Sequence, residues 1–332
     1  FVPVDVEETG YTNDTQNYYV VLGGGAAGFN AAKAIRERDK TGSVVLISNE
    51  DYPAYNRPML TKSIVAGLSA EQIAIEDPKW YEENRVYQML GRQVESVDMD
   101  AKEVVLDGGD RIRFTKLVYA LGSECFIPPM EGSRLPEVVA IRRLSDVEKV
   151  ECLMEKSEKA VVIGGGVLGL EAAWELKKGG LDVQVLEVAP VLMGRQLDAG
   201  SAEILKEIAD KNGVKIRTGV SVAAIEGEEH VTGVRLSDGE VIPAELVIVS
   251  AGVRANTQLA QEMGMDIGRA VKVNAHMETS AADVYACGDC AEYEGANYAI
   301  WPEAVEQGRI AGANAAGEEL EYEPVEAALT FH

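Results

Sequence analysis

The sequence predicts an α/β protein built from two similar units. One pattern, an apolar strand followed at once by G-x-G-x-x-G and then by a helix, occurs near residues 18–37 and again near residues 160–178. After each helix comes a second apolar strand with a glutamate close to its end. Strands that alternate with helices indicate parallel sheets covered on both faces, so we expect two Rossmann-like three-layer domains. The 332 residues, 46% of them hydrophobic, suffice for two such domains.

Composition excludes several classes of function. The net charge of −24 argues against nucleic acid and against an anionic membrane surface as partners, because both would repel the chain. The longest apolar run, 160–170, ends at Glu171 and is too short to span a bilayer. The N-terminus lacks the pattern of a signal peptide, and the four cysteines are mostly scattered. We therefore expect a reduced, cytoplasmic protein; its oligomeric state stays open.

The first glycine motif has each part that a dinucleotide requires. Gly23 permits the tight turn, Gly25 lets the backbone approach a pyrophosphate, and Gly28 lets the helix pack closely on the strand. Glu50 follows Gly23 by 27 residues and is placed to bind ribose hydroxyls; we expect the loop 39–43 to absorb this long spacing. Phosphates are stabilised by the unpaired amides at the helix N-terminus. We expect the pyrophosphate on Gly23, Gly25, Ala26, Ala27 and Gly28.

The second motif repeats the first with a shorter spacing. Glu187 follows Gly164 by 23 residues, close to the usual separation. An acid here binds the 2′-hydroxyl of the adenosine ribose and repels a 2′-phosphate, so the sequence predicts NADH rather than NADPH. Arg195 offers the competing interpretation of a 2′-phosphate ligand, but it follows a proline-containing turn. The residues expected at the second pyrophosphate are Gly164, Gly166, Val167, Leu168 and Gly169.

Two dinucleotide sites in one chain narrow the class of protein, because a flavoprotein reduced by a nicotinamide needs two. With these motifs, the sequence resembles the pyridine nucleotide-disulphide oxidoreductase superfamily from about Tyr18 to the end. Two small-residue turns, YALGS at 119–123 and SAGVR at 250–254, add to the resemblance. It is greatest to NADH:rubredoxin reductases, the reductases of oxygenase ferredoxins and the flavin modules of assimilatory nitrite reductases. The cofactors implied are FAD at the first site and NADH at the second.

The resemblance implies further contacts with the cofactors. Ala120 and Gly122 lie in the turn that closes the first half of the FAD domain, and Gly252 is their counterpart in the NAD domain. Val94 matches a position whose backbone meets the adenine of FAD. Arg142 matches an arginine near the flavin.

A late Gly-Asp pair, Gly288 and Asp289, resembles the one that binds the ribityl and pyrophosphate region of FAD. The segment after it, with Pro302, Glu303 and Ala304, resembles a helix N-terminus aimed at the pyrimidine edge of the flavin. Reduction places negative charge at that edge, where the positive end of a helix is favourable.

The segment 55–62, YNRPMLTK, resembles the one that lies along the isoalloxazine ring. The resemblance places Arg57 near FAD phosphate or ring oxygens and Lys62 near flavin N5, the atom that receives hydride. Glu171 matches the acid that pairs with this lysine. Without the resemblance, Lys62 would be taken for a solvated lysine.

Cysteine placement decides between branches of the superfamily. Disulphide reductases keep a redox cysteine just after the Arg-Pro turn, and residues 57–68 contain none. We expect Cys125 and Cys152 to be inert core residues and the C-x-x-C formed by Cys287 and Cys290 to be coincidental. Two cysteines alone do not make a metal site, so none is predicted.

The expected organisation is an FAD domain of 15–125 and 253–317 with an NAD domain, 126–252, inserted in it. Residues 318–332 would begin a truncated C-terminal interface domain. Residues 1–14 resemble the tail of a rubredoxin and would form a linker in a rubredoxin–reductase fusion. The predicted function is hydride transfer from NADH to FAD, then electron transfer to rubredoxin or a similar carrier. The alternatives are an NADH oxidase, a nitrite reductase flavin module or, outside enzymes, a flavin-binding redox sensor.

Overall fold

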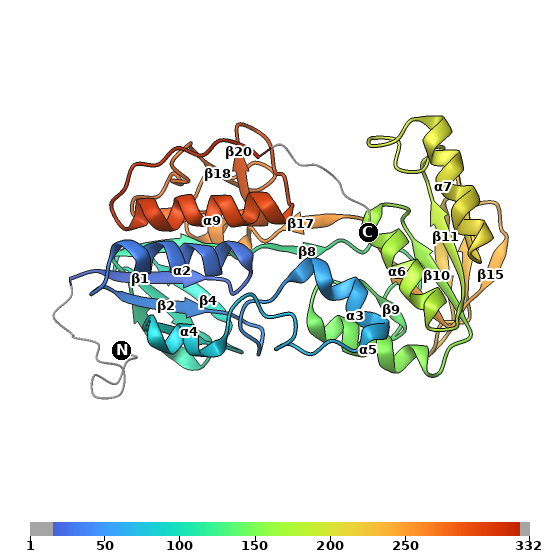
Figure 1. The fold of residues 1–332 in the computed structure, drawn as a ribbon, viewed down its shortest axis with the longest axis horizontal. Helices are drawn as coiled ribbons and strands as arrows, with labels where there is room; N and C mark the ends of the chain where they lie inside the picture. The colour runs from blue at the N-terminus through green and yellow to red at the C-terminus, as the bar shows by residue number, and fades with distance from the viewer. Residues whose placement is uncertain (1–15, 326–332) are drawn as a thin grey trace. The chain divides into compact units, whose positions relative to one another are not determined.

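The computed structural model describes residues 16–325, and the chain divides into two compact units (Figure 1). The predicted α/β class is confirmed, because each unit is centred on a five-stranded parallel sheet. The first unit comprises Phe1–Asn56, Ala70–Glu124 and Ala255–His332, and the second comprises Arg57–Ser69 and Cys125–Arg254.

The two sheets share one topology. In the first unit the order is β19-β7-β1-β2-β3, and in the second it is β12-β11-β10-β16-β9. In both sheets, the strand that precedes the glycine motif lies at the centre: β1 in the first unit and β10 in the second. The next two strands along the chain that join the sheet after its glycine motif lie on one side of it. This is the arrangement of doubly wound dinucleotide-binding sheets. The strands of the first sheet are β1 (Tyr18–Leu22), β2 (Ser43–Ile47), β3 (Val86–Met89), β7 (Lys116–Tyr119) and β19 (Val284–Ala286).

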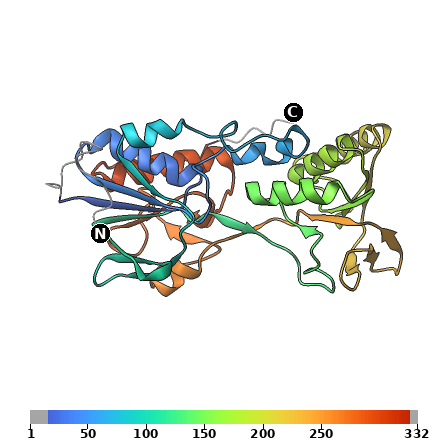
Figure 2. The ribbon, with the colours of Figure 1, turned by 90° about the horizontal axis from the view of Figure 1, so that it is seen from below.

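Helices and small sheets cover both faces of the first sheet. Helices α2 (Ala26–Arg38) and α9 (Trp301–Ala315) lie side by side on one face, and β4–β6 lie on the other (Figures 1 and 2). The helices approach closely because α9 presents glycines: a Cβ on Gly308 would lie 2.3 Å from the carbonyl oxygen of Ala27, and one on Gly312 2.2 Å from that of Ala31. The other elements are α4 (Pro78–Glu83), β4 (Val94–Asp98), β5 (Glu103–Leu106), β6 (Arg111–Arg113), α8 (Gln258–Glu262), β18 (Val271–Val273) and β20 (Ala291–Tyr293).

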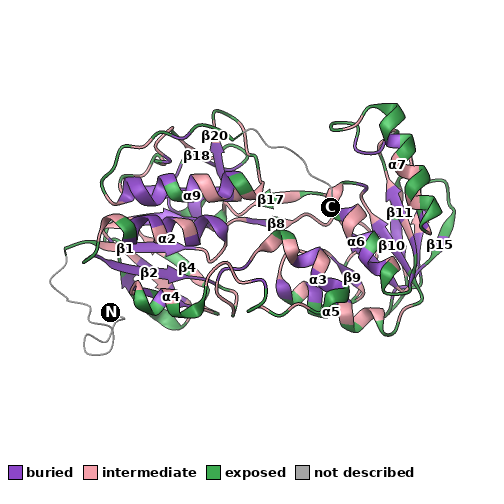
Figure 3. Cartoon of the chain, viewed as in Figure 1, coloured by how far each residue is buried: buried purple, intermediate pink, exposed green. Residues whose placement is uncertain are grey.

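The second unit has the same layering. Its strands are β9 (Val138–Val139), β10 (Lys159–Ile163), β11 (Asp182–Glu187), β12 (Val214–Thr218) and β16 (Leu246–Val249). Helices α6 (Val167–Lys178) and α7 (Ala199–Lys211) contact the sheet, and a three-stranded antiparallel sheet packs apolar side chains against β10 and β16. Figure 3 shows the central strands of both units buried and the outer helix faces exposed. The small sheet consists of β13 (Val222–Glu226), β14 (Gly233–Leu236) and β15 (Val241–Pro243).

One segment lies in a different unit from the one expected. The sequence assigned residues 57–69 to the first unit, but the structure groups them with the second. Their helix α3 (Leu60–Ala66) packs on α6 and on α5 (Leu144–Met154) and buries Leu60, Thr61, Ser63 and Ile64. Tertiary packing decides this assignment, and a seven-residue helix has no local signal for it. The boundaries at 124/125 and 254/255 fall within two paired strands, β8 (Ser123–Cys125) and β17 (Val253–Ala255).

Both fingerprint helices begin earlier than the sequence predicts. The sequence predicts helices that begin after the last glycine of each motif, over 29–37 and 170–178, but α2 begins at Ala26 and α6 at Val167. Gly28 and Gly169 therefore lie inside the first turns. They are helical residues whose missing Cβ allows contact with the turn, since a Cβ there would lie 1.9 Å and 2.1 Å from the carbonyl oxygens of Gly23 and Gly164.

The expectation that Cys125 and Cys152 are core residues is wrong. Cys125 is half-buried, and Cys152 is exposed on α5. The buried face of α5 consists of Leu144, Val147 and Val150, and Cys152 falls away from it by the helical repeat. Within residues 16–325, no helix is long and apolar enough to cross a membrane, and no cluster of three or more potential ligands could hold a metal ion.

Candidate functional site

Each unit presents a glycine turn at the point where strand order reverses. In open parallel sheets, ligands bind outside the carboxyl ends of the strands at this point. Gly23 follows β1 with φ +108°, and a Cβ on it would lie 1.9 Å from the carbonyl oxygen of Ala120, just beyond β7. Gly164 follows β10 with φ +112°, and its Cβ would lie 2.0 Å from the oxygen of Ser250, just beyond β16. Only glycine fits these two positions.

The glycine at the start of each helix is the N-cap. Gly25 and Gly166 both have extended backbone and neither receives a side-chain cap. The first amides of a helix have no partner within it, and the helix dipole adds positive potential there. A Cβ on Gly166 would meet no atom within 4 Å, so open space lies beside this helix end. The arrangement fits a dinucleotide pyrophosphate.

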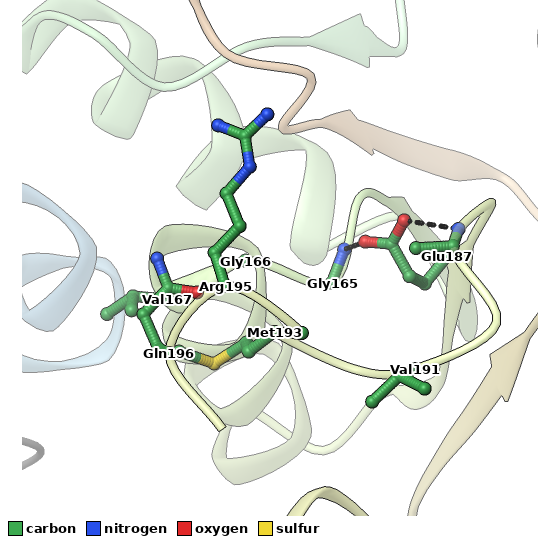
Figure 4. A pocket seen from close by; sticks show the side chains of 10 residues that line it. Gly165, Gly166, Val167, Glu187, Val191, Met193, Arg195 and Gln196 are labelled. Carbon is green, nitrogen blue, oxygen red and sulfur yellow. Dashed lines mark hydrogen bonds between the residues drawn. The ribbon is translucent and has the colours of Figure 1, made fainter. Parts of the chain in front are cut away.

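A cavity of about 170 Å³ adjoins the second turn (Figure 4). Its acidic group is Glu187, at the end of β11, whose carboxylate is held by two backbone amides. Gly165 N–H donates to Oε2 over 2.8 Å, and Ala189 N–H donates to Oε1 over 2.9 Å. The amides fix the carboxylate beside the glycine turn, and each oxygen keeps a lone pair for a ribose hydroxyl. The cavity is lined by Gly165, Gly166, Val167, Glu187, Ala189, Val191, Met193, Gly194, Arg195 and Gln196.

Arg195 lies in the wall of the same cavity, on the loop between β11 and α7. Its side chain is exposed, and in Figure 4 it extends away from Glu187. Within residues 16–325 it forms no ion pair with Glu187 or any other acid. The loop is anchored by Leu192 and Met193, which are buried against α6 and α7. The structure thus places one cation and one anion on the wall of a single cavity.

Sheet register explains the different glycine-to-acid spacings. Leu22 pairs with Ile47 in the first sheet, 25 residues on, whereas Ile163 pairs with Leu186 in the second, 23 residues on. Two of the four extra residues therefore precede β2. One lies in the loop after α2, as expected, and the other lengthens α2 to 13 residues against 12 in α6. The other two arise because Glu50 lies three residues beyond Ile47, whereas Glu187 directly follows Leu186.

The position equivalent to Glu187 in the first unit is Ser48, not Glu50. Ser48 is buried, and a Cβ on Gly24 would lie 2.8 Å from its hydroxyl. The amide of Glu50 donates to this hydroxyl over 3.2 Å. Its carboxylate accepts a 2.5 Å hydrogen bond from Tyr55. Tyr55 belongs to the segment that the resemblance places along the isoalloxazine ring, but neither its bond to Glu50 nor the position of Ser48 has a local signal in the sequence.

The Gly-Asp pair forms a short 3₁₀ turn after β19, the last strand of the first sheet. Gly288 has φ +79° and donates its N–H to Oε1 of Gln307 over 2.9 Å. The carboxylate of Asp289 accepts a 3.0 Å hydrogen bond from Ser123. Gln307 was not expected from the sequence, because a glutamine inside a helix has no local signal.

Helix α9 begins at Trp301 with Pro302 in its first turn, as expected, and the side chain of Glu303 is turned into the first unit. Glu303 is 1% exposed; its carboxylate bonds the phenol of Tyr322 and accepts from the amide of Val325 over 2.7 Å. Burial raises the pKa of this carboxyl. The Glu303 carboxylate is therefore engaged inside the first unit. The amide of Ala304 donates to the carbonyl oxygen of Ile300 over 3.0 Å, so any amide that α9 offers to a ligand precedes Ala304.

In the second unit, the structure places the expected catalytic pair on neighbouring helices, Lys62 on α3 and Glu171 on α6. Glu171 accepts a 2.9 Å hydrogen bond from the hydroxyl of Thr61, and no ion pair joins Glu171 to Lys62 in the described chain. Both side chains are half-buried. Thr61 is thus a further residue that sequence reasoning did not identify. Arg57 donates to the carbonyl oxygen of Arg142 over 2.5 Å.

The remaining predicted residues lie in turns or at the first residues of strands and helices. Gly122 and Gly252 have φ +66° and +87° in the turns after β7 and β16. Val94 begins β4 and pairs with Leu106, and its carbonyl oxygen accepts from the side chain of Gln93 over 3.3 Å. Leu168 is 55% exposed at the start of α6.

Cys287 and Cys290 are free thiols beside the Gly-Asp turn, and both are fully buried. Burial raises the pKa of Cys287 well above its ordinary value and that of Cys290 to about 12. A buried thiol with a raised pKa is a poor nucleophile, so the pair has the properties of core residues.

Comparison with known proteins agrees with this geometry. The family model of the pyridine nucleotide-disulphide oxidoreductases matches residues 17–308. The chain belongs to this family. Members of the pyridine nucleotide-disulphide oxidoreductase family use FAD and NADH, the two cofactors that the fingerprints predict.

Individual members of the family differ in their named activities. A nitrite reductase [NAD(P)H] of Bacillus subtilis is 35% identical over 93% of this chain, which spans 38% of that protein. An NADH oxidase of Methanocaldococcus jannaschii is 35% identical over 92% of this chain and 71% of its own length. The crystal structure of NADH:rubredoxin oxidoreductase from Clostridium acetobutylicum superposes with a TM-score of 0.82 at 32% identity, covering 94% of this chain and 78% of that one.

Proposed function

We propose that the chain is an NADH-dependent flavoprotein reductase, with FAD held by the first unit and NADH by the second. The observation that supports this most directly is the repeated site. Two glycine turns of the same geometry lie at the switch points of their sheets. Glu187 accepts from the amide of Gly165 in one turn, and Glu50 bonds Ser48, which lies against Gly24 of the other. Two dinucleotide sites are what hydride transfer between a nicotinamide and a flavin needs.

The residues of the chain have distinct roles in this proposal. The amides at the starts of α2 and α6 bind the two pyrophosphates, and Glu50 and Glu187 bind the adenosine riboses. Gly288 and Asp289 contact the ribityl and pyrophosphate region of FAD, and the N-terminus of α9 stabilises charge on its pyrimidine edge. FAD, when bound, accepts a hydride and can release electrons singly.

Lys62 supplies positive charge at the reacting end of the site in this proposal. Glu171 orients the end of α3 through Thr61, since its carboxylate accepts the hydrogen bond of that hydroxyl. Arg57 and Arg142 add further positive charge to the same unit. Such fixed charges act mainly on the chemical step, where charge develops.

The proposed acceptor is rubredoxin or a similar one-electron carrier. The likeness to the NADH:rubredoxin oxidoreductase of C. acetobutylicum supports it. So does the burial of Cys287 and Cys290, which leaves no reactive thiol beside the Gly-Asp turn. NADH oxidase is a second candidate, because a relative with that name is 35% identical. A nitrite reductase flavin module and a redox sensor are further alternatives.

The distribution of charge affects which carrier can bind. The first unit contains 34 acidic and 14 basic residues, a net charge of −20, and the second contains 21 and 17, a net charge of −4. Long-range repulsion therefore slows an acidic carrier that approaches the first unit. A tethered carrier reaches an effective concentration of about millimolar despite such repulsion.

The proposed N-terminal fusion rests on residues 1–14, which lie outside the described residues. Residues 326–332, at the end of the expected interface domain, also lie outside them. A cytoplasmic location stays a prediction.

Acceptor preference is tested by anaerobic turnover of the FAD-loaded chain with NADH and a panel of rubredoxin, a ferredoxin and nitrite, followed by oxygen. We expect rubredoxin to be reduced with the highest kcat/KM, and its rate to rise with salt as repulsion is screened. A higher kcat/KM for oxygen would favour the NADH oxidase instead. Flavin that NADH cannot reduce would contradict the reductase proposal itself.

A further inference from the structure

We propose that Tyr55 is a positioning residue for FAD: its phenol orients the carboxylate of Glu50 toward the adenosine ribose. The inference rests on the proposed function, because it takes the first unit as the FAD site. Tyr55 lies outside both glycine motifs. Its side chain acts through Glu50.

The contact is short and built into the fold. Tyr55 Oη donates to Oε1 of Glu50 over 2.5 Å, and the tyrosine is only 3% exposed. A buried phenol needs a hydrogen-bond partner, and the carboxylate provides a strong acceptor. The bond therefore restricts the rotamers of a glutamate that lies in a loop.

The backbone on both sides of Tyr55 is held by a second segment. Tyr55 forms an antiparallel bridge with Ala74. Asn56 N–H donates to the carbonyl oxygen of Ile73 over 2.7 Å, and Ile75 N–H donates to that of Ala54 over 3.0 Å. Two chain segments thus pair where the chain leaves the first unit and returns to it, and this pairing fixes the position of the phenol.

The two acids are oriented by different groups. Glu187 directly follows the paired end of its strand, where the amides of Gly165 and Ala189 bind its carboxylate. Glu50 lies two residues further along, and Ser48 occupies the position equivalent to Glu187. Glu50 therefore lies beyond the position at which backbone amides orient the carboxylate of Glu187. Tyr55 supplies an orienting bond at its new position.

The test is a double-mutant cycle on FAD affinity. Apoprotein of the wild type, Tyr55→Phe, Glu50→Ala and the double variant is titrated with FAD, and flavin fluorescence gives each Kd. Tyr285→Phe is the matched control, because Tyr285 is also buried in the first unit and its phenol donates to the carbonyl oxygen of Asn314 over 3.3 Å, away from Glu50. The melting temperature of each apoprotein is measured in parallel.

We expect Tyr55→Phe to weaken FAD binding about tenfold, as for loss of one hydrogen bond to a charged group, with Tyr285→Phe near wild type. The double variant should bind FAD as Glu50→Ala does, because the phenol acts only through the carboxylate. Independent, multiplicative losses in the double variant, or unchanged affinity in Tyr55→Phe, would overturn the proposal. Wild-type apoprotein that fails to bind FAD would instead overturn the proposed function.

Discussion

Replacement of Glu187 by alanine should reverse or greatly reduce the preference for NADH over NADPH. The carboxylate is held beside the second glycine turn by the amides of Gly165 and Ala189. In the wild type it accepts from a ribose hydroxyl and repels a 2′-phosphate. Glu187→Ala removes both effects at once, so they add in the ratio of kcat/KM values for the two coenzymes.

The magnitude follows from these two terms. A hydrogen bond to a charged group contributes about 1.5–3 kcal/mol, which NADH loses. Like charges about 4 Å apart interact by up to about 4 kcal/mol near a protein surface, and solvent screening leaves a fraction of this for NADPH to regain. A combined shift of about 3 kcal/mol changes the ratio of kcat/KM values roughly a hundredfold.

The assay is anaerobic stopped-flow reduction of the bound flavin, with the Kd and the limiting rate determined for each coenzyme. Glu245→Ala is the control, because it also removes one acid from the second unit. Glu245 accepts from the amide of Lys159 over 2.9 Å at the amino end of β10, whereas Glu187 lies at the carboxyl end of the neighbouring strand. The control should keep the wild-type ratio. An unchanged ratio in Glu187→Ala would refute the assignment of this carboxylate to the ribose.

Three further predictions concern other parts of the structure. Arg195→Gln should lower kcat/KM for NADPH more than for NADH, since the guanidinium is the cation in the wall of the cavity; equal losses would place it on the pyrophosphate. Lys62→Ala should slow flavin reduction more than it weakens NADH binding. In the same assay, the effects of Thr61→Val and Glu171→Ala should be non-additive, and additive effects would mean that the 2.9 Å hydrogen bond between these two residues has no functional effect. Hydrogen bonds from Lys102 and Lys116 lower the pKa of Asp283. The carboxylate therefore stabilises the fold at pH values above its ordinary pKa of 3.8, and this stabilisation is lost as the pH falls through the lowered pKa. Asp283→Asn should lower the midpoint of urea unfolding at neutral pH, and the difference from the wild type should disappear in strong acid.

The sequence was sufficient for the glycine turns because their geometry is imposed by local sterics. Gly23 and Gly164 have positive φ and face a carbonyl oxygen that leaves no room for a Cβ. A motif under such a constraint can be recognised without knowledge of the rest of the fold. The strands beside it follow from apolar runs, and the predicted layers follow from the alternation of strands and helices.

Features that depend on tertiary packing could not be predicted. The unit to which residues 57–69 belong is decided by the contacts of α3 with α5 and α6. The inward role of Glu303 depends on Tyr322, which is 19 residues away along the chain. The hydrogen bond of Tyr55 depends on the exact register of β2, because that register places Glu50 beyond the strand end.

Hydride transfer between the two cofactors is tested most directly by mixing the FAD-reconstituted chain with NADH under anaerobic conditions and following the flavin absorbance. One equivalent of NADH should bleach the flavin in a single turnover, with a rate that saturates as the NADH concentration is raised. Glu187→Ala should require more NADH to reach saturation. A flavin that stays oxidised with excess NADH, although FAD is bound stoichiometrically, would contradict the central claim that the two units pass a hydride between their cofactors.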